Sequence, residues 1–124
     1  MNNEEKRKHA RKKISFTVNV TGIIRGNEVL PKPTGQLFAG TEVSAGGMGL
    51  ETVAEVKMND LLALQFTLPG EKKALTLSGR VVNLAVIKSS KIAGKLRLGI
   101  RFEGLSRVDQ TYLANYIGTT FLIY

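Results

Sequence analysis

The regular alternation of apolar and polar residues in short segments is the feature of this chain that most limits its fold. In residues 14–20, apolar side chains occupy every second position from Ile14 to Val20, and residues 95–102 repeat the pattern from Leu96 to Phe102. A period of two is typical of a strand with one buried face. Extended character also marks residues 36–43, 48–52, 61–68 and 74–87. The sequence therefore predicts about six strands.

Turn-forming residues separate these segments. Pro69 and Gly70 end one of them with a strong turn signal. Residues 21–35 are rich in glycine and proline, so we expect mainly turn and loop there, with at most a short extension around Ile23 and Ile24. Gly79 lies inside residues 74–87, which suggests a bulge or a close approach of another backbone.

The end of the chain changes period. Ser106 and Asp109 form a capping-box pattern, in which the serine caps the first turn and the carboxylate reaches back. Val108, Tyr112, Leu113, Tyr116 and Ile117 then recur at helical spacing, and Gly118 is expected to end the helix. Strands followed by one helix predict a mainly β protein, a six-stranded antiparallel barrel in residues 14–124 with a C-terminal α-helix, rather than a doubly wound fold.

Positive charge is concentrated before the first predicted strand. The chain has a formal net charge of +8. Residues 1–13 hold six lysines and arginines against two glutamates, a local charge of +4. We expect this segment to be a flexible basic arm. Such an arm suits an anionic partner, which could be a nucleic acid, a nucleotide, a membrane surface or an acidic protein, and it could also be a solvated tail.

Several functional classes find no support in the sequence. The chain has no cysteine, which excludes disulfides and thiolate metal sites, and His9 is its one histidine. No metalloprotease motif, EF-hand loop or phosphate-binding P-loop occurs. We therefore expect no catalysis, no catalytic residue and no metal. The polar first residues do not resemble a signal peptide, and no apolar stretch is long enough to span a bilayer, so we expect a cytoplasmic protein.

Two short elements carry the functional signal. Arg7 and Arg11 lie four positions apart just before the first predicted strand. Glu42, Ser44 and Gly47 follow in an ExSxxG spacing between the next two strands. Taken alone, an arginine pair of this spacing is common in basic arms, and the ExSxxG segment could be a plain hairpin turn with a solvated glutamate. Their order on one predicted barrel is the more specific observation.

In this order the two elements resemble the PilZ domain family. Members have an RxxxR motif followed about 20–40 residues later by (D/N)xSxxG, on a six-stranded barrel with a C-terminal helix. Residues 66–69, 98–102 and 112–117 add to the resemblance, which covers nearly the whole chain. Glu42 departs from the pattern, because the family has Asp or Asn there. The extra methylene changes the hydrogen-bond geometry at that position.

The resemblance implies a stand-alone receptor for cyclic di-GMP. Arg7 and Arg11 would hold phosphate or the guanine O6 and N7 edge through their planar forks. Glu42 would accept from guanine N1–H and the 2-amino group, and Ser44 would donate to phosphate or base. Gly47 would permit a close approach. Gly99 would let the ligand lie against the sheet, although it could equally be a bulge glycine.

Binding would order the arm and signal to a protein partner in motility, adhesion or polysaccharide control, as the resemblance implies. Two other hypotheses remain. A degenerate family member would act as a protein-interaction adaptor that binds no nucleotide, and Glu42 is the best support for it. A nucleic-acid-binding barrel would need exposed aromatic side chains, and only 6% of the residues are aromatic, with most at predicted core positions. We therefore expect no specific nucleic acid partner.

Overall fold

The structure, a computed structural model, describes residues 11–33, 38–89 and 91–121, of which 119–121 are described by backbone alone. His9 and Arg7 lie outside the described residues. The elements in chain order are β1 (Arg11–Arg25), β2 (Glu28–Leu30), β3 (Phe38–Ser44), β4 (Gly47–Thr52), β5 (Leu61–Thr67), β6 (Ala74–Val86), β7 (Leu96–Glu103) and α1 (Arg107–Phe121).

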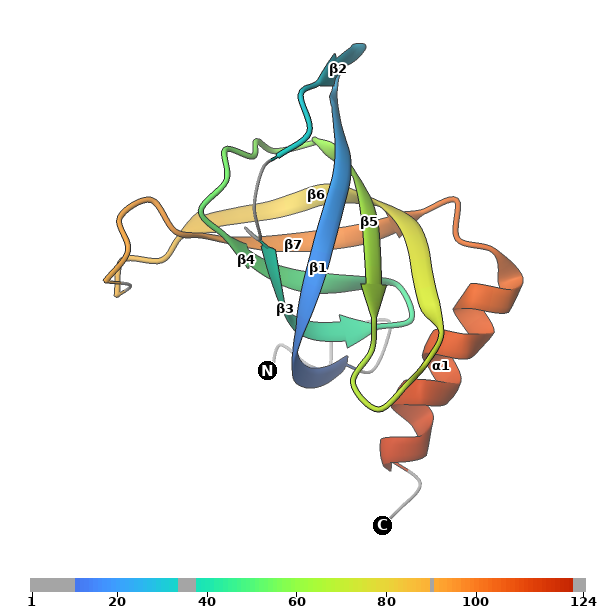
Figure 1. Cartoon of the computed structure of the whole chain (residues 1–124). Coiled ribbons are helices and arrows are strands. Elements are labelled where there is room, and N and C mark those ends of the chain that lie inside the picture. The colour runs from blue at the N-terminus through green and yellow to red at the C-terminus, as the bar shows by residue number, and fades with distance from the viewer. Residues whose placement is uncertain (1–10, 34–37, 90, 122–124) are drawn as a thin grey trace, which may run out of the picture.

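Six of the strands form a closed antiparallel barrel. They are hydrogen-bonded in the order β1-β3-β4-β7-β6-β5, and β5 pairs back with β1 (Figure 1). Closure pairs both edges of each of these strands, which removes the open edges that promote aggregation. The predicted fold, a six-stranded antiparallel barrel with a C-terminal helix, is confirmed.

The alternation seen in the sequence produces the core. In β7, Leu98, Ile100 and Phe102 are buried while Arg97 and Arg101 face outward. β5 and the first half of β6 show the same division, so that their inner faces fill the barrel and their outer faces meet water.

The helix begins as the sequence predicted but ends later. Ser106 Oγ accepts a hydrogen bond from the Asp109 backbone N–H at 3.1 Å, which confirms the cap. The Asp109 carboxylate pairs with Lys73 Nζ at 3.3 Å instead of reaching back. The predicted stop at Gly118 is wrong, because Gly118 lacks the positive φ of a helix-terminating glycine and α1 continues to Phe121.

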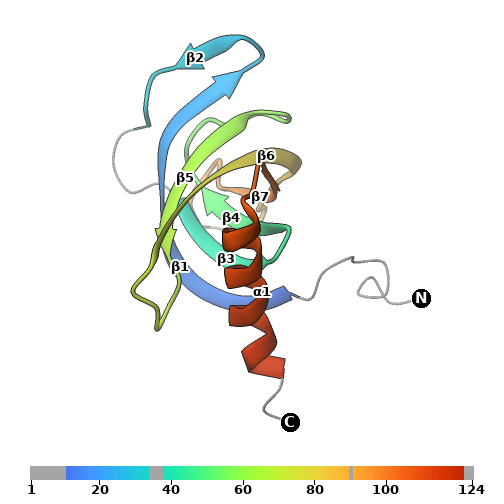
Figure 2. The ribbon, with the colours of Figure 1, turned by 90° about the vertical axis from the view of Figure 1, so that its right-hand side faces the viewer.

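The inner side of α1 is fastened to the barrel, whereas Val108, which the helical spacing placed on the same apolar stripe, is exposed. Leu113 and Ile117 are buried in the core. Tyr112 donates its hydroxyl hydrogen bond to Glu71 at 2.7 Å and Tyr116 donates to the Pro69 carbonyl at 3.0 Å, both in the loop after β5. Figure 2 shows α1 lying against the outside of the barrel.

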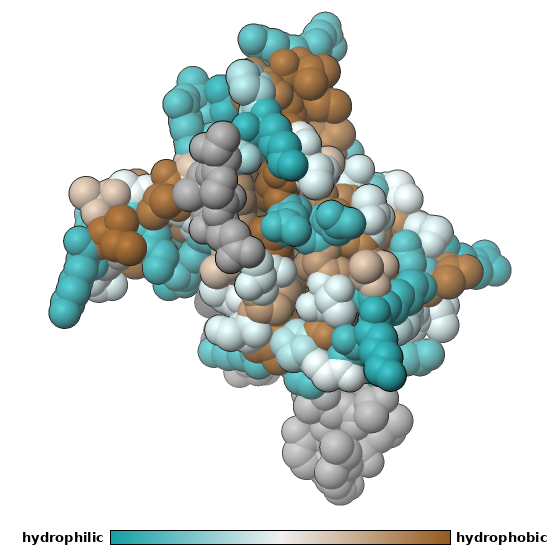
Figure 3. Space-filling model, in the orientation of Figure 1, coloured by the Kyte–Doolittle hydropathy of each residue, from teal (hydrophilic) through white to brown (hydrophobic). Residues whose placement is uncertain are grey.

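The first strand is longer than the sequence predicted. It continues through residues that we expected to be loop, pairs with β5 up to Ile24 and then turns at Gly26 and Asn27 into β2. A register shift between Val20 and Gly22 interrupts the alternation there, which hid the strand. Gly26 has a φ of 62°, which the tight turn requires. The hairpin projects from the barrel in Figure 1, and its exposed apolar side chains form part of the brown area at the top of Figure 3.

The start of β1 also moves relative to the predicted boundary. We placed the end of the basic arm after Lys13, yet β1 begins at Arg11, and Arg11 to Lys13 pair with Ser44 to Glu42 of β3. Arg11 is therefore held by the barrel sheet. Residues 1–10 of the predicted arm lie outside the described residues.

Asp60, in the loop just before β5, anchors the base of the hairpin. Its carboxylate is fully buried and accepts two hydrogen bonds of 2.9 Å from the Arg25 guanidinium and one of 2.9 Å from the Lys57 backbone N–H. Burial alone raises the pKa of this carboxyl, but the hydrogen bonds from Arg25 and Lys57 outweigh burial and leave the pKa lowered. Asp60 is consequently ionised at neutral pH.

Candidate functional site

The turn between β3 and β4 is built around the Ser44 hydroxyl. Ser44 Oγ accepts hydrogen bonds from the backbone N–H groups of Gly46 at 3.2 Å and Gly47 at 3.0 Å, and it lies 3.3 Å from the Gly47 carbonyl, to which it donates. Ser44 is buried. In this state the hydroxyl supports the turn, which agrees with the hairpin interpretation of the sequence.

Gly47 is required by the strand beside it. A Cβ at Gly47 would collide with the backbone carbonyl oxygen of Ile100 in β7. The Phe102 backbone N–H donates to the Gly46 carbonyl at 2.9 Å, which joins the turn to β7. The glycine thus allows β4 to approach β7 closely at the edge of the site.

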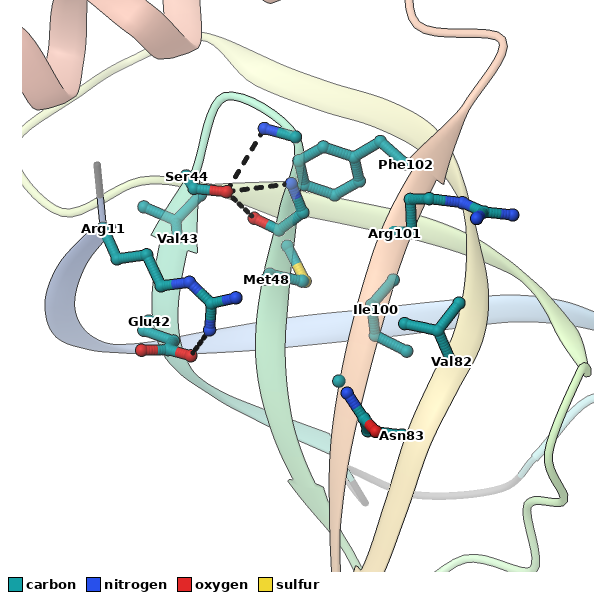
Figure 4. Close-up of a pocket in the computed structure, with 13 residues that line it drawn as sticks. Arg11, Glu42, Val43, Ser44, Met48, Val82, Asn83, Ile100, Arg101 and Phe102 are labelled. Atoms are coloured by element: carbon teal, nitrogen blue, oxygen red, sulfur yellow. Dashed lines mark hydrogen bonds and ion pairs between the residues drawn. The ribbon is translucent and has the colours of Figure 1, made fainter. Parts of the chain in front are cut away.

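Arg11 and Glu42 form an ion pair over the outer face of the sheet. Arg11 Nη1 donates to Glu42 Oε1 at 2.6 Å. The Arg11 side chain remains 41% exposed and the Glu42 side chain 21%. One branch of the guanidinium is therefore occupied, and the rest of the planar fork still faces solvent (Figure 4).

Gly99 lies in the middle of this face. It pairs with Gly49 on β4 and with Asn83 on β6. A Cβ at Gly99 would come within 3.1 Å of the Asn83 Cβ, so the position has little room for a side chain while Asn83 keeps its place. The bulge that the sequence left open at Gly99 is on β6, between Val81 and Asn83.

A pocket of about 590 Å³ brings these residues together. Figure 4 shows it between the ends of β1 and β3 on one side and β6 and β7 on the other. Its volume is in the range of small-molecule sites, roughly 300–1,000 Å³. Its lining residues are Arg11, Glu42, Val43, Ser44, Gly46, Gly47, Met48, Val82, Asn83, Gly99, Ile100, Arg101 and Phe102.

Five of the six residues predicted from the sequence line this pocket, and Arg7 lies outside the described residues. The sequence did not single out Val82, Asn83 or Met48. Asn83 faces the pocket because of the bulge in β6, and no feature of the sequence marks that bulge. Arg101 of β7 also lines the pocket directly.

The charge in the pocket favours an anion. Its lining includes two guanidinium groups, from Arg11 and Arg101, and one carboxylate, from Glu42. Arg101 Nη2 lies 3.4 Å from Glu103, and its side chain is 64% exposed. Glu103 is held more closely by Arg80, whose hydrogen bonds are the main cause of its lowered pKa. Arg101 is therefore only loosely engaged.

Two absences concern the described residues alone. Among them, no group of three histidine, cysteine, aspartate or glutamate side chains is close enough to hold a metal ion. The single helix within the described ranges is too short and too polar to cross a membrane.

Known structures share this fold at low sequence identity. The chain matches the PilZ domain of YcgR from Escherichia coli, solved with cyclic di-GMP, at 17% identity and a TM-score of 0.65, covering 91% of this chain and 89% of that one. It matches MotI/DgrA, the Bacillus subtilis inhibitor of motility, at 18% identity and a TM-score of 0.68, covering 94% of this chain and 51% of that one.

MrkH of K. pneumonia, solved as a cyclic di-GMP complex, matches at 17% identity and a TM-score of 0.67, covering 94% of this chain and 52% of that one. The chain thus spans about half the length of MotI/DgrA and MrkH. No curated protein sequence matches it. Residues 5–118 match the family model of the PilZ domain, and the chain therefore belongs to the PilZ domain family.

Proposed function

We propose that this chain is a receptor domain that binds cyclic di-GMP without catalysing a reaction. The observation that carries the proposal is the pocket itself, which gathers Arg11, Glu42, Ser44, Gly47 and Gly99 from four strands onto one face. All of these except Gly99 belong to the two sequence motifs, which are separated by about 30 residues of chain. Two of the similar structures were solved with cyclic di-GMP, which supports the ligand class.

The chemistry of the pocket suits the two parts of this ligand. The exposed part of the Arg11 fork and the loosely held Arg101 offer planar donors for phosphate oxygens or a base edge. The Glu42 carboxylate can accept from guanine N1–H and the 2-amino group. Ser44 and Gly47 act first by shaping the turn beneath these groups. Arg7 remains a proposed contact on the sequence motif alone.

Signalling to a protein partner completes the proposal. One similar structure is described as an inhibitor of motility and another as a transcription regulatory factor, so proteins that contain this fold take part in regulation. We propose that ligand binding changes the surface around the pocket and that a partner in motility, adhesion or polysaccharide control responds to it.

One observation favours a second candidate function. Glu42 already neutralises Arg11 at 2.6 Å, and a ligand must compete with that ion pair. If the competition is lost, the domain is an adaptor that binds a protein partner and no nucleotide.

Isothermal titration with cyclic di-GMP separates the two functions. GTP and a short single-stranded oligonucleotide serve as ligand controls. Saturable binding in the micromolar range or tighter, absent for both controls, supports the receptor. If no heat of binding is detected, and a second binding method also finds no binding, the adaptor function is supported instead.

A further inference from the structure

A row of four residues crosses the pocket face at right angles to the strands. Glu42 of β3 pairs with Gly49 of β4, Gly49 pairs with Gly99 of β7, and Gly99 pairs with Asn83 of β6. The row therefore has a carboxylate at one end, an amide at the other and two glycines between them.

Two bulges turn the ends of the row toward the pocket. The register shifts between Gly40 and Glu42 on β3, and between Val81 and Asn83 on β6. Each shift breaks the strict alternation, so that Thr41 and Glu42 both face outward, as do Val82 and Asn83. Bulges are common beside functional sites because they redirect a side chain in this way. Without the second bulge, Asn83 would point into the core.

Neither glycine puts a side chain between the polar ends, and Gly99 is the one of the two that lines the pocket. A Cβ on Gly49 would come within 2.8 Å of the Thr41 Oγ1 and 3.0 Å of the Glu42 Cγ, and a Cβ on Gly99 would come within 3.3 Å of the Asn83 Nδ2. The side chains of Thr41 and Glu42 therefore cover Gly49, and the Asn83 amide lies beside Gly99. Three strand spacings separate β3 from β6, roughly 14 Å, which accommodates a purine and a hydrogen bond at each end.

The Asn83 amide is free to meet a ligand. Its side chain is exposed, and no hydrogen bond joins this amide to another residue in the part of the chain that the structure describes. An asparagine amide offers two donors and a carbonyl acceptor on a short side chain.

We infer that Asn83 is a further specificity-determining residue of the proposed site, an inference that rests on the proposed function. A guanine lies flat over Gly99, between the Glu42 carboxylate and the Asn83 amide. Its N1–H and 2-amino group donate to Glu42, while the Asn83 Nδ2–H donates to the opposite N7 and O6 edge. Both ends of the row then match guanine, whose two edges carry donors on one side and acceptors on the other.

The base at this site is selected by the pairing of donors and acceptors. Adenine has no N1–H and would present a lone pair to the Glu42 carboxylate, which leaves two acceptors facing each other. At the Asn83 end of the row, an aspartate would have only acceptor oxygens to face the N7 and O6 acceptors of guanine, so no hydrogen bond could form. Asn83→Asp is therefore a specific test, because it keeps the size of the side chain and removes the donor.

The experiment titrates cyclic di-GMP and cyclic di-AMP into the parent, Asn83→Ala, Asn83→Asp and Asn19→Ala. Asn19 is the matched control, an exposed asparagine on β1 outside the pocket lining. We expect Asn83→Ala to weaken cyclic di-GMP binding about three- to tenfold, as the loss of one hydrogen bond does. Asn83→Asp should weaken it at least about tenfold further, and Asn19→Ala should match the parent.

Thermal unfolding of each variant shows whether the barrel is intact. Parent-like affinity in both Asn83 variants would overturn the role of Asn83 while leaving the receptor function in place. Equal loss in the Ala and Asp variants would also overturn the donor role of Asn83. A parent chain that binds no cyclic di-GMP would overturn the proposed function itself, and the role of Asn83 with it.

Discussion

Replacing Arg11 with alanine tests the receptor function most directly. A charge-assisted hydrogen bond to a ligand contributes about 1.5–3 kcal/mol, or about 10- to 150-fold in affinity. The gain is partly offset, because Arg11 must give up an exposed ion pair with Glu42 that contributes about 0–1 kcal/mol. Removing Arg11 also leaves the Glu42 carboxylate uncompensated beside the ligand phosphates. We therefore expect cyclic di-GMP to bind Arg11→Ala about 10- to 100-fold more weakly.

Isothermal titration measures the change, and Arg97→Ala provides the matched control. Arg97 is also an exposed arginine on a barrel strand, and its own ion pair with Glu51 is longer at 3.7 Å. Thermal stability should be nearly unchanged in both variants, since neither side chain is part of the core. If Arg11→Ala binds as tightly as the parent, the assignment of this arginine is wrong.

Three further outcomes follow from the geometry. Glu42→Asp should keep or increase the affinity in the same titration, because the shorter side chain weakens the ion pair with Arg11 that competes with the ligand. A clear loss of affinity would show that the longer carboxylate of Glu42 makes its own contact with the ligand. Gly99→Val should reduce the affinity at least about tenfold, since it covers the pocket face beside Asn83 and its Cβ would lie within 3.1 Å of the Asn83 Cβ. Thermal unfolding of the variant measures what this close contact costs in stability, and binding unaffected by the added side chain would place the ligand elsewhere. Asp60→Asn should lower the free energy of unfolding by about 3 kcal/mol and the midpoint by about 10 °C in thermal denaturation. The pKa of Asp60 is lower in the folded state than in the unfolded state, so its stabilisation is present above the unfolded value of about 3.9 and is lost as the pH falls through the folded pKa. The difference in unfolding free energy between the parent and Asp60→Asn should therefore narrow in acid. A difference that widened in acid would count against the ion pair.

The alternation of apolar residues was sufficient to predict most of the barrel. Each period-two segment gave a strand whose apolar side is buried, as at Leu98 and Ile100. The prediction was wrong where a register shift broke the period. The stretch after Val20 has the composition of a loop, yet pairing with β5 and the burial of Ile23 make it strand. Local sequence carries no signal of such long-range pairing.

Some residues of the candidate site could be predicted from the sequence and others could not. Arg11, Glu42 and Gly47 belong to motifs with fixed spacing, so the sequence alone predicts them as candidates, and all three line the pocket. Asn83 belongs to no motif, and it reaches the pocket only because β6 shifts its register by one residue against β7. The role of Asp60 was missed because its partner Arg25 lies on a strand that the sequence did not reveal.

The pairing of β4 with β7 joins the two halves of the pocket, and it is a contact between distant parts of the chain. Strands β3 and β4 form one local hairpin, β6 and β7 are joined by another local connection, and Glu42 and Asn83 come together only when the two meet. Barrels dominated by pairings between distant strands fold on the order of milliseconds to seconds, because the entropy cost of closing the long loops comes before the stabilising contacts form. We therefore expect the pocket to be among the last parts of the molecule to form. A molecule bound across the pocket would hold the two halves together. Such a ligand should reduce the rate of global unfolding more than it reduces the rate at which either hairpin opens locally.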